Sequence, residues 1–350
     1  MQSDPIIDNA LMIQIMLERV KSEVINNRNL ASDLRKTVAK ALAEFSGHIS
    51  SRNKLRLIVN SLKKELKPLL QNYSDVLLNF VIQTAIEMAH LEYLGLSQWF
   101  DDVNAVDDKK VESSMNNTPI SLTQWNGSLF LDRFIATWID NSLQQIENQA
   151  VLTMASSEDV NYLKDSINGT SVEPMIIAAA VIGRIIRNYQ TIASTALQHA
   201  HSVAAVDFYK ENPDMIEEEE FSAILDLKTS TVCRSLSGNR YPLGTGPMPP
   251  LHPRCRSRLL PVLKPELMKK LVTKPARKSE WGEETYYEWL TRQSATRQDI
   301  VLGSTRGKLF RDGGLSPAQF AKLQLHKNFK PMTLEEMRRV APDAFKRAGI

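Results

Sequence analysis

Hydrophobic residues recur at spacings of three and four through the first 215 residues, which is the period of helices that bury one face. The pattern predicts six helices, over residues 6–26, 30–48, 54–70, 74–94, 129–154 and 175–209. Ser74 is a suitable N-cap for the fourth of these, and Gly95 is a suitable stop for it. We interpret the apolar stripes as packed core, which needs no cofactor to explain it.

Polar segments interrupt the helical pattern. Residues 101–119 contain DDKK and MNNTP and have little to bury, so they predict a break between helices. After Pro213 the composition changes. Four acidic residues at 217–220 predict a solvated turn or a helix start, and the apolar segment 221–225 predicts a strand.

A proline- and glycine-rich segment follows, and apolar residues resume at 259–263. Helical patterns return at 265–273, 283–292, 316–322 and 334–338. Turn signals separate them at Gly303, Gly307, Gly313, Gly314 and Pro331. We therefore predict a mainly α-helical N-terminal region and a small α+β C-terminal module, because the chain is long for one core.

Charge is divided unevenly along the chain. The net charge is +3, but the last 100 residues hold 21 Lys and Arg against 10 Asp and Glu, and the first 250 hold 22 against 30. A basic end of this kind suits contact with phosphate. An ordinary solvated surface explains the same counts.

The sequence predicts a soluble protein of a reducing cytoplasm. Two cysteines in 350 residues do not make a disulfide scaffold. The N-terminus lacks a basic stretch followed by an apolar one, so no secretory signal is expected. The longest apolar run, residues 175–183, is far shorter than the roughly 20 residues that span a bilayer.

The segment 226–262 contains the residues that are best suited to bind a metal. It holds both cysteines, Cys233 and Cys255, and His252 lies three residues before the second cysteine. Thiolate and imidazole are zinc ligands, and zinc takes four ligands. The spacing resembles the two arms of a small zinc module.

A fourth donor is less obvious from the sequence. Asp226 is the nearest, and His199 or His201 could reach in from the preceding helix. Ser230 stands where a cysteine would complete a C-x2-C arm, which weakens the zinc signal.

Three other interpretations of these residues stay open. The cysteines can be reduced, packed thiols that are hydrogen-bonded to His252 and Asp226. They can form a disulfide, although the expected compartment disfavours one. A catalytic Cys–His pair is also conceivable, but no orienting acid or oxyanion site is evident nearby.

Basic residues around the second cysteine suggest contact with nucleic acid. Arg254, Arg256 and Arg258 alternate with other residues, and in a strand they would share one face. Such a face, together with Lys269 and Lys270, would bind the phosphate backbone of DNA without reading its sequence. The same arginines could instead pair with the acidic run at 217–220.

The combined motif resembles a known family. D-x-x-T-S-x-x-C-x-x-L-x-G begins at Asp226, PPLHPRCR begins at Pro249, and Pro-Val follows at 261–262. This closely resembles the signature of the phage minor head protein family, also called the Mu F-like or phage head morphogenesis domain. Residues 187–209 look like the helix that opens this domain, and residues 297–315 resemble its C-terminal extension. The first 186 residues match no family that we can name, so the resemblance divides the chain into a helical region, residues 1–186, and the family module, residues 187–350.

The resemblance implies a structural protein with no enzymatic activity. Such proteins are minor components of tailed-phage heads that associate with the portal vertex during assembly and are linked to DNA packaging or delivery. We expect residues 1–186 to bind the portal protein and other capsid or internal head proteins, and the basic part to face packaged DNA. We expect the chain to be made in the host cytoplasm, to oligomerise through the portal vertex and to lie in the head interior near it.

Two rival functions remain at this point. One is a metal-dependent nuclease or hydrolase that acts on the packaged genome, which would need an open metal position and a base. The other is a helical adaptor that binds neither metal nor DNA. Only about 90 residues follow the cysteine module, and they resemble the ordinary extension, so a toxin domain is not expected.

Overall fold

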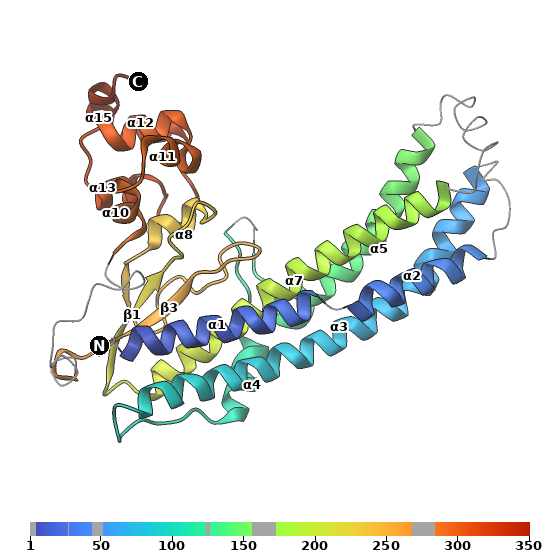
Figure 1. Ribbon diagram of the computed structural model, residues 1–350, viewed down its shortest axis with the longest axis horizontal. Helices are drawn as coiled ribbons and strands as arrows, with labels where there is room; N and C mark the ends of the chain where they lie inside the picture. Colours follow the sequence, from blue (N-terminus) through green and yellow to red (C-terminus); the bar gives the residue numbers. More distant parts are fainter. Residues whose placement is uncertain (1–4, 27, 44–51, 124–126, 156–172, 268–283) are drawn as a thin grey trace. The chain divides into compact units, whose positions relative to one another are not determined.

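The computed structural model of the protein is mainly helical. It describes residues 5–26, 28–43, 52–123, 127–155, 173–267 and 284–350. Within these ranges there is one antiparallel sheet of three short strands, in the C-terminal half (Figure 1). This confirms the predicted fold class. None of the helices that the structure describes has the length and apolar character needed to cross a lipid bilayer.

Contacts divide the chain into two compact units that are not consecutive in sequence. Unit 1 comprises residues 1–17, 84–128 and 198–350, and unit 2 comprises residues 18–83 and 129–197. Two long helices, α3 (Arg52–Ser97) and α7 (Glu173–Glu211), contribute to both units. The boundary expected after residue 186 falls inside α7, so the chain crosses it as continuous helix and not as a linker.

Unit 2 is a helical bundle. It contains α2 (Arg28–Ala43), α5 (Leu131–Ala155), and parts of α1 (Pro5–Ile25), α3 and α7 (Figure 1). Trp138 of α5 is fully buried, and its indole N–H donates to the carbonyl of Ile185 on α7 at 3.0 Å. Its ring packs on Tyr189, with 4.9 Å between centroids. A buried indole needs such a partner for its N–H, so this contact fixes α5 against α7.

Helix α3 replaces two predicted helices. The prediction of a break before Ser74 is wrong, since Ser74 lies buried inside the helix and does not cap it. Leu70 and Leu77 are both almost fully buried, so one apolar stripe runs past the expected break. The helix also accommodates Pro68. Continuous burial on one face thus outweighs the local signals of serine and proline.

The polar stretch 101–119, expected as a break, contains the short helix α4 (Asp108–Asn117). Asp107 caps it by accepting a hydrogen bond from the Lys109 amide at 2.9 Å. Val111 and Met115, one turn apart, are fully buried. One buried apolar pair and a good cap are enough to form a helix here because the pair is buried within unit 1.

The sheet has the strand order β2-β1-β3, with both pairs antiparallel. The strands are β1 (Ile216–Ser222), β2 (Arg240–Pro242) and β3 (Arg258–Leu263). The acidic run 217–220 therefore lies in β1, so its assignment to a turn or helix start is wrong, and the strand ends before most of 221–225. Burial alternates along β1, which buries Glu219. Its carboxylate accepts from the amides of Gly244 at 3.1 Å and Gly246 at 3.0 Å, which offsets the cost of burial.

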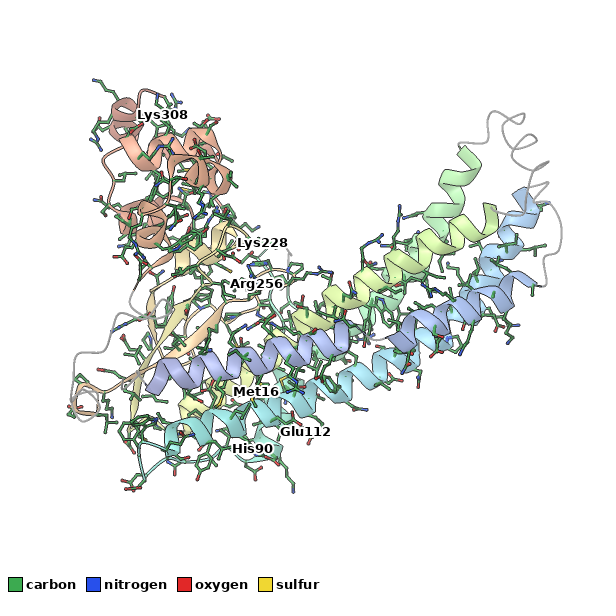
Figure 2. All side chains as sticks on the ribbon, in the orientation of Figure 1. Met16, His90, Glu112, Lys228, Arg256 and Lys308 are labelled. Carbon is green, nitrogen blue, oxygen red and sulfur yellow. The ribbon has the colours of Figure 1, made fainter. Side chains whose placement is uncertain are left out.

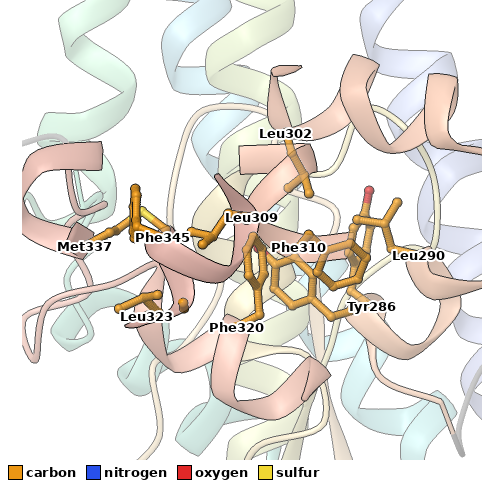
Figure 3. Close-up of a cluster of buried hydrophobic side chains, with 12 residues drawn as sticks. Tyr286, Leu290, Leu302, Leu309, Phe310, Phe320, Leu323, Met337 and Phe345 are labelled. Atoms are coloured by element: carbon orange, nitrogen blue, oxygen red, sulfur yellow. The ribbon is translucent and has the colours of Figure 1, made fainter. Parts of the chain in front are cut away.

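The C-terminal residues form six short helices around one core. These are α10 (Tyr286–Thr291), α11 (Ala295–Leu302), α12 (Ser304–Asp312), α13 (Pro317–Leu323), α14 (Leu334–Val340) and α15 (Pro342–Ala348). The prediction of helices is confirmed for α10, α13 and α14, whereas α11, α12 and α15 were not predicted. Figure 3 shows this core. The rings of Tyr287, Phe310 and Phe320 pack together, with 4.8 to 5.8 Å between centroids.

Gly307 lies within α12 and is not a turn. A Cβ at this position would lie 2.0 Å from the Asp299 carboxylate of α11. The glycine therefore permits the close approach of two consecutive helices. From the sequence alone, a glycine with this role cannot be distinguished from a glycine in a turn.

Candidate metal centre

The first arm of the motif positions Cys233 through a short helix, α8 (Thr231–Leu236). Ser230 caps this helix by accepting a hydrogen bond from the Cys233 amide at 3.3 Å. Cys233 is only 1% exposed. The serine that stands in place of a cysteine in the sequence thus serves as the N-cap that fixes the direction of Cys233.

The second arm forms a tight turn from His252 to Cys255. The Cys255 amide donates to the His252 carbonyl at 3.1 Å, and Arg254 between them has a left-handed backbone, with φ of 57°. Upstream, the amide and the hydroxyl of Thr123 both donate to the carbonyl of Leu251, at 2.9 and 3.0 Å. The turn is therefore fixed at its start, and Cys255 is fully buried at its end.

The two arms bring Cys233, His252 and Cys255 together. Cys233 Sγ lies 3.3 Å from His252 Nε2 and 3.7 Å from Cys255 Sγ. All three donor atoms lie within 4.8 Å of one another, so the cluster can hold a metal ion. The sulfur separation is far longer than the roughly 2.05 Å of a disulfide, and both cysteines are free thiols.

These separations match those of ligands around one tetrahedral ion. With bonds of about 2.3 Å to sulfur and about 2.0 Å to nitrogen, two sulfurs lie roughly 3.8 Å apart and a sulfur and a nitrogen roughly 3.5 Å apart. The observed values are 3.7 and 3.3 Å. Both separations from Cys233 therefore match a tetrahedral metal centre to within a few tenths of an ångström, and the third, between Cys255 Sγ and His252 Nε2, is within 4.8 Å.

The imidazole of His252 is oriented by the backbone of the next residue. Its Nδ1 lies 2.9 Å from the carbonyl of Pro253, a partner that requires the proton on Nδ1. The lone pair of Nε2 is then directed toward the sulfurs. Metal-binding histidines are generally oriented by such a second hydrogen bond.

The two thiols differ in acidity. The neighbouring Cys255, together with burial, raises the pKa of Cys233 well above its ordinary value. The hydrogen bond from Cys233 lowers the pKa of Cys255 well below its ordinary value, aided by His252 and the Leu251 amide. Burial alone would lower the pKa of His252, but the Cys255 sulfur outweighs it, so this pKa is raised. The cluster thus favours a thiolate at Cys255, the form that binds metal.

Asp226 does not belong to the ligand set. Its carboxylate is paired with Arg256, at 2.9 Å and 3.0 Å, and also accepts from the Lys228 amide and the Thr229 hydroxyl. Burial alone would raise the pKa of Asp226, but these hydrogen bonds outweigh it and lower the pKa. The expectation of a fourth ligand here is wrong because the turn directs the carboxylate to Arg256.

The two histidines of α7 have other partners. His199 is buried, with Nε2 3.0 Å from the Thr118 carbonyl, and burial lowers its pKa to about 4. His201 is buried with its Nε2 3.7 Å from the carboxylate of Glu92. Among the described residues, the metal-capable group is limited to the two cysteines and His252.

The predicted basic face is not formed by the three arginines. Arg258 is the one that lies in β3, and it is buried, with its guanidinium donating to the Ala10 carbonyl. Arg254 is exposed in the turn, and Arg256 is half-buried against Asp226. Strand alternation does not apply because β3 begins only at Arg258. Lys269 and Lys270 lie outside the described residues.

A small pocket of about 40 Å³ adjoins the cluster, and Cys233 and His252 form part of its wall. Lys228, Arg254 and Arg256 also line it. Figure 2 labels Lys228 and Arg256, which lie near each other at this site. Lys228 was not singled out from the sequence, because only the turn at Asp226 brings it beside the second arm.

Comparison of the chain with known proteins finds no matching family model, no matching curated protein and no matching solved structure.

Proposed function

We propose that this chain is a structural minor head protein of a tailed phage. In this function it associates with the portal vertex and acts in head assembly and in DNA packaging or delivery. The support is the motif that runs from Asp226 to Val262, together with a fold that combines long helices and a small α+β module.

The observation that carries the proposal is the convergence of the two motif arms on one cluster. The arms are separated in sequence by a proline- and glycine-rich connection with little regular structure. Cys233 and Cys255, one from each arm, are both buried with 3.7 Å between their sulfurs. Because the two arms of the motif meet at one cluster, their residues act together. A cluster that joins two segments in this way suits a rigid docking module.

Zinc is the metal that we propose for this cluster. Two thiolates and one imidazole are a donor set that zinc accepts, and thiolates disfavour magnesium and calcium. The ion would join α8 to the turn at His252 and so fix an irregular loop, as structural zinc does in small modules. The chain itself supplies three ligands among the described residues, so a water molecule or an external group would complete four.

An open fourth position also occurs in hydrolytic zinc centres, so the placement of the nearby acid and base groups decides for a structural role. A hydrolytic centre needs a base within hydrogen-bond reach of the attacking water. Asp226, the carboxylate nearest in sequence, is paired with Arg256. The His252 ring nitrogen that faces away from the sulfurs lies against the Pro253 carbonyl.

Co-expression with the portal protein and the major capsid protein of the same phage tests the proposal. We expect the chain to be incorporated into particles in a fixed, small number of copies, measured by quantitative mass spectrometry. Cys255→Ser should reduce incorporation and zinc content together. Val232→Ala is the matched control, because Val232 is buried in the same module but is not a ligand.

Two results would contradict the proposal. One is the absence of the chain from particles that assemble with normal portal content. The other is cleavage of DNA by the purified, zinc-loaded chain that is lost in His252→Ala while incorporation is retained, which would favour the nuclease.

A further inference from the structure

The pocket beside the metal cluster has the character of an anion site. Three cationic side chains line it: Lys228 from the turn before α8, and Arg254 and Arg256 from the second arm. Among the described residues that line the pocket there is no carboxylate. Asp226 lies next to it, paired with Arg256, so the local balance remains positive.

Hydrogen bonds to the Asp226 carboxylate and the backbone conformation of the turn hold these cations in place. The Asp226 carboxylate accepts from the Lys228 amide at 2.9 Å and from Arg256 Nη2 at 3.0 Å, which ties the two segments that carry Lys228 and Arg256 to one group. Arg254 occupies a left-handed backbone position in the turn. A bulky residue rarely adopts this conformation, and strain of this kind is found where a side chain must be presented in one direction.

Hydroxyl groups complete the lining. Thr229 and Ser230 border the pocket between Lys228 and Cys233. The Thr229 hydroxyl already donates to the Ile224 carbonyl and the Asp226 carboxylate, so the ammonium and guanidinium groups are the donors that match the several oxygens of one tetrahedral oxyanion. Arginine binds phosphate oxygens in pairs. With a volume of about 40 Å³ the pocket is small, which suits a single tetrahedral group.

We propose that this pocket binds one phosphate group, beside the metal cluster and in contact with Lys228, Arg254 and Arg256. The inference rests on the proposed function, since a protein of the phage head meets the phosphates of packaged DNA. The shared chemistry is that of a phosphate oxyanion, either free or as a diester of the DNA backbone. The sequence predicted an extended arginine face, whereas the proposed site is local and has Lys228 in place of Arg258.

The test is calorimetric titration of inorganic phosphate into the full-length, zinc-loaded protein at low ionic strength. We expect saturable binding at one site per chain. Lys228→Gln should weaken it by about tenfold, since each cation supplies a charge-assisted hydrogen bond. Arg254→Asn should act similarly, and asparagine tolerates the left-handed backbone, so the variant keeps the turn.

Lys308→Gln is the matched control. Lys308 is an exposed lysine of α12 that does not line the pocket, so the same loss of charge there should change binding by less than about twofold. The absence of saturable binding by folded protein would overturn the proposal. Equal weakening by Lys308→Gln would also overturn it, because binding would then follow total charge.

Two further arms separate the source of the phosphate and the state of the metal. If the site takes backbone phosphate, Lys228→Gln and Arg254→Asn weaken the binding of a short DNA duplex as well as of inorganic phosphate. If it takes free phosphate only, duplex binding matches that of the control. Zinc content, measured on the same samples, distinguishes the two proposals. If the protein takes up no zinc but binds phosphate, the zinc proposal fails and the phosphate proposal stands.

Discussion

Removal of one cluster ligand gives the sharpest test of the metal centre. Cys233 is 1% exposed, and its sulfur lies 3.3 Å from the His252 nitrogen and 3.7 Å from the Cys255 sulfur. Cys233→Ala removes one of the three side chains that can hold a metal ion and leaves the other two in place. We expect the variant to fold with a weakened affinity for zinc and to lose the stability that zinc adds.

The expected loss follows from mass action. When free zinc exceeds its Kd by a thousandfold, binding adds about 4.1 kcal/mol to the free energy of unfolding. Changes to outer-shell partners alone weaken metal affinity by about 10–100-fold, so loss of a ligand should cost about 100-fold or more. At the same free zinc the contribution then falls to about 1.4 kcal/mol, a loss of about 2.7 kcal/mol.

The measurement is urea unfolding of each protein at fixed free zinc and again with excess chelator. The difference between the two curves isolates the zinc contribution from the packing cost of the substitution. Val232→Ala in the same helix is the control, because it should lower stability by about 1–3 kcal/mol in both conditions and leave the zinc-dependent difference unchanged. Zinc content by elemental analysis accompanies each curve.

The refuting results are specific. If Cys233→Ala keeps one zinc per chain and the full chelator-dependent difference, Cys233 is not a ligand. If the native protein shows no dependence on zinc or chelator, the two cysteines and the histidine form a packed, hydrogen-bonded cluster without metal.

Three more predictions follow from single contacts. Asp226→Asn should lower stability at neutral pH by about 1 kcal/mol, a small value because the pair with Arg256 is one-third exposed. The pKa of Asp226 is lowered in the folded protein, so its contribution to stability is present above the unfolded pKa and is lost as pH falls through the folded pKa. The stability curves of the native protein and the variant should therefore converge in acid. A difference in stability that stays constant with pH would exclude the ion pair as the cause. Phe320→Ala should cost about 3–5 kcal/mol in chemical unfolding, because the ring is fully buried, whereas exposed Phe130→Ala should cost about 0.5 kcal/mol or less, and equal costs would contradict the C-terminal core. Burial lowers the pKa of His199 to about 4 in the folded protein, so as pH falls from 6.5 to 4 the unfolded chain takes up a proton that the folded protein does not. The native protein should therefore lose about 3 kcal/mol of stability over this range, and His199→Gln should abolish that loss. An unchanged pH profile would show that other groups control it.

The sequence by itself determined the fold class and most of the long helices. Periodic burial is a local property, so α1, α2, α5 and α7 lie close to their predicted ranges. The sequence also indicated Cys233, His252 and Cys255 as a group, because their spacing resembles the two arms of a small zinc module, while packed thiols and a disulfide stayed open as alternatives. The structure brings these three residues within 4.8 Å.

Only the tertiary structure decided which groups pair across the chain. Asp226 lies near the cysteines in sequence, but Arg256 takes its carboxylate. Glu219 is buried in a strand because two amides of a later loop donate hydrogen bonds to its carboxylate. The sequence of the acidic run does not predict those donors. Likewise, α3 continues past Ser74 because its buried face is continuous with its neighbours.

The physical reason is the range of the interactions. Helix periodicity and capping depend on residues within a turn or two of one another, so a sequence pattern reports them directly. Ion pairs, buried hydrogen bonds and the walls of a pocket depend on the directions of side chains from segments far apart, and those directions are fixed only once the backbone has folded. The pocket of Lys228, Arg254 and Arg256 is of this second kind.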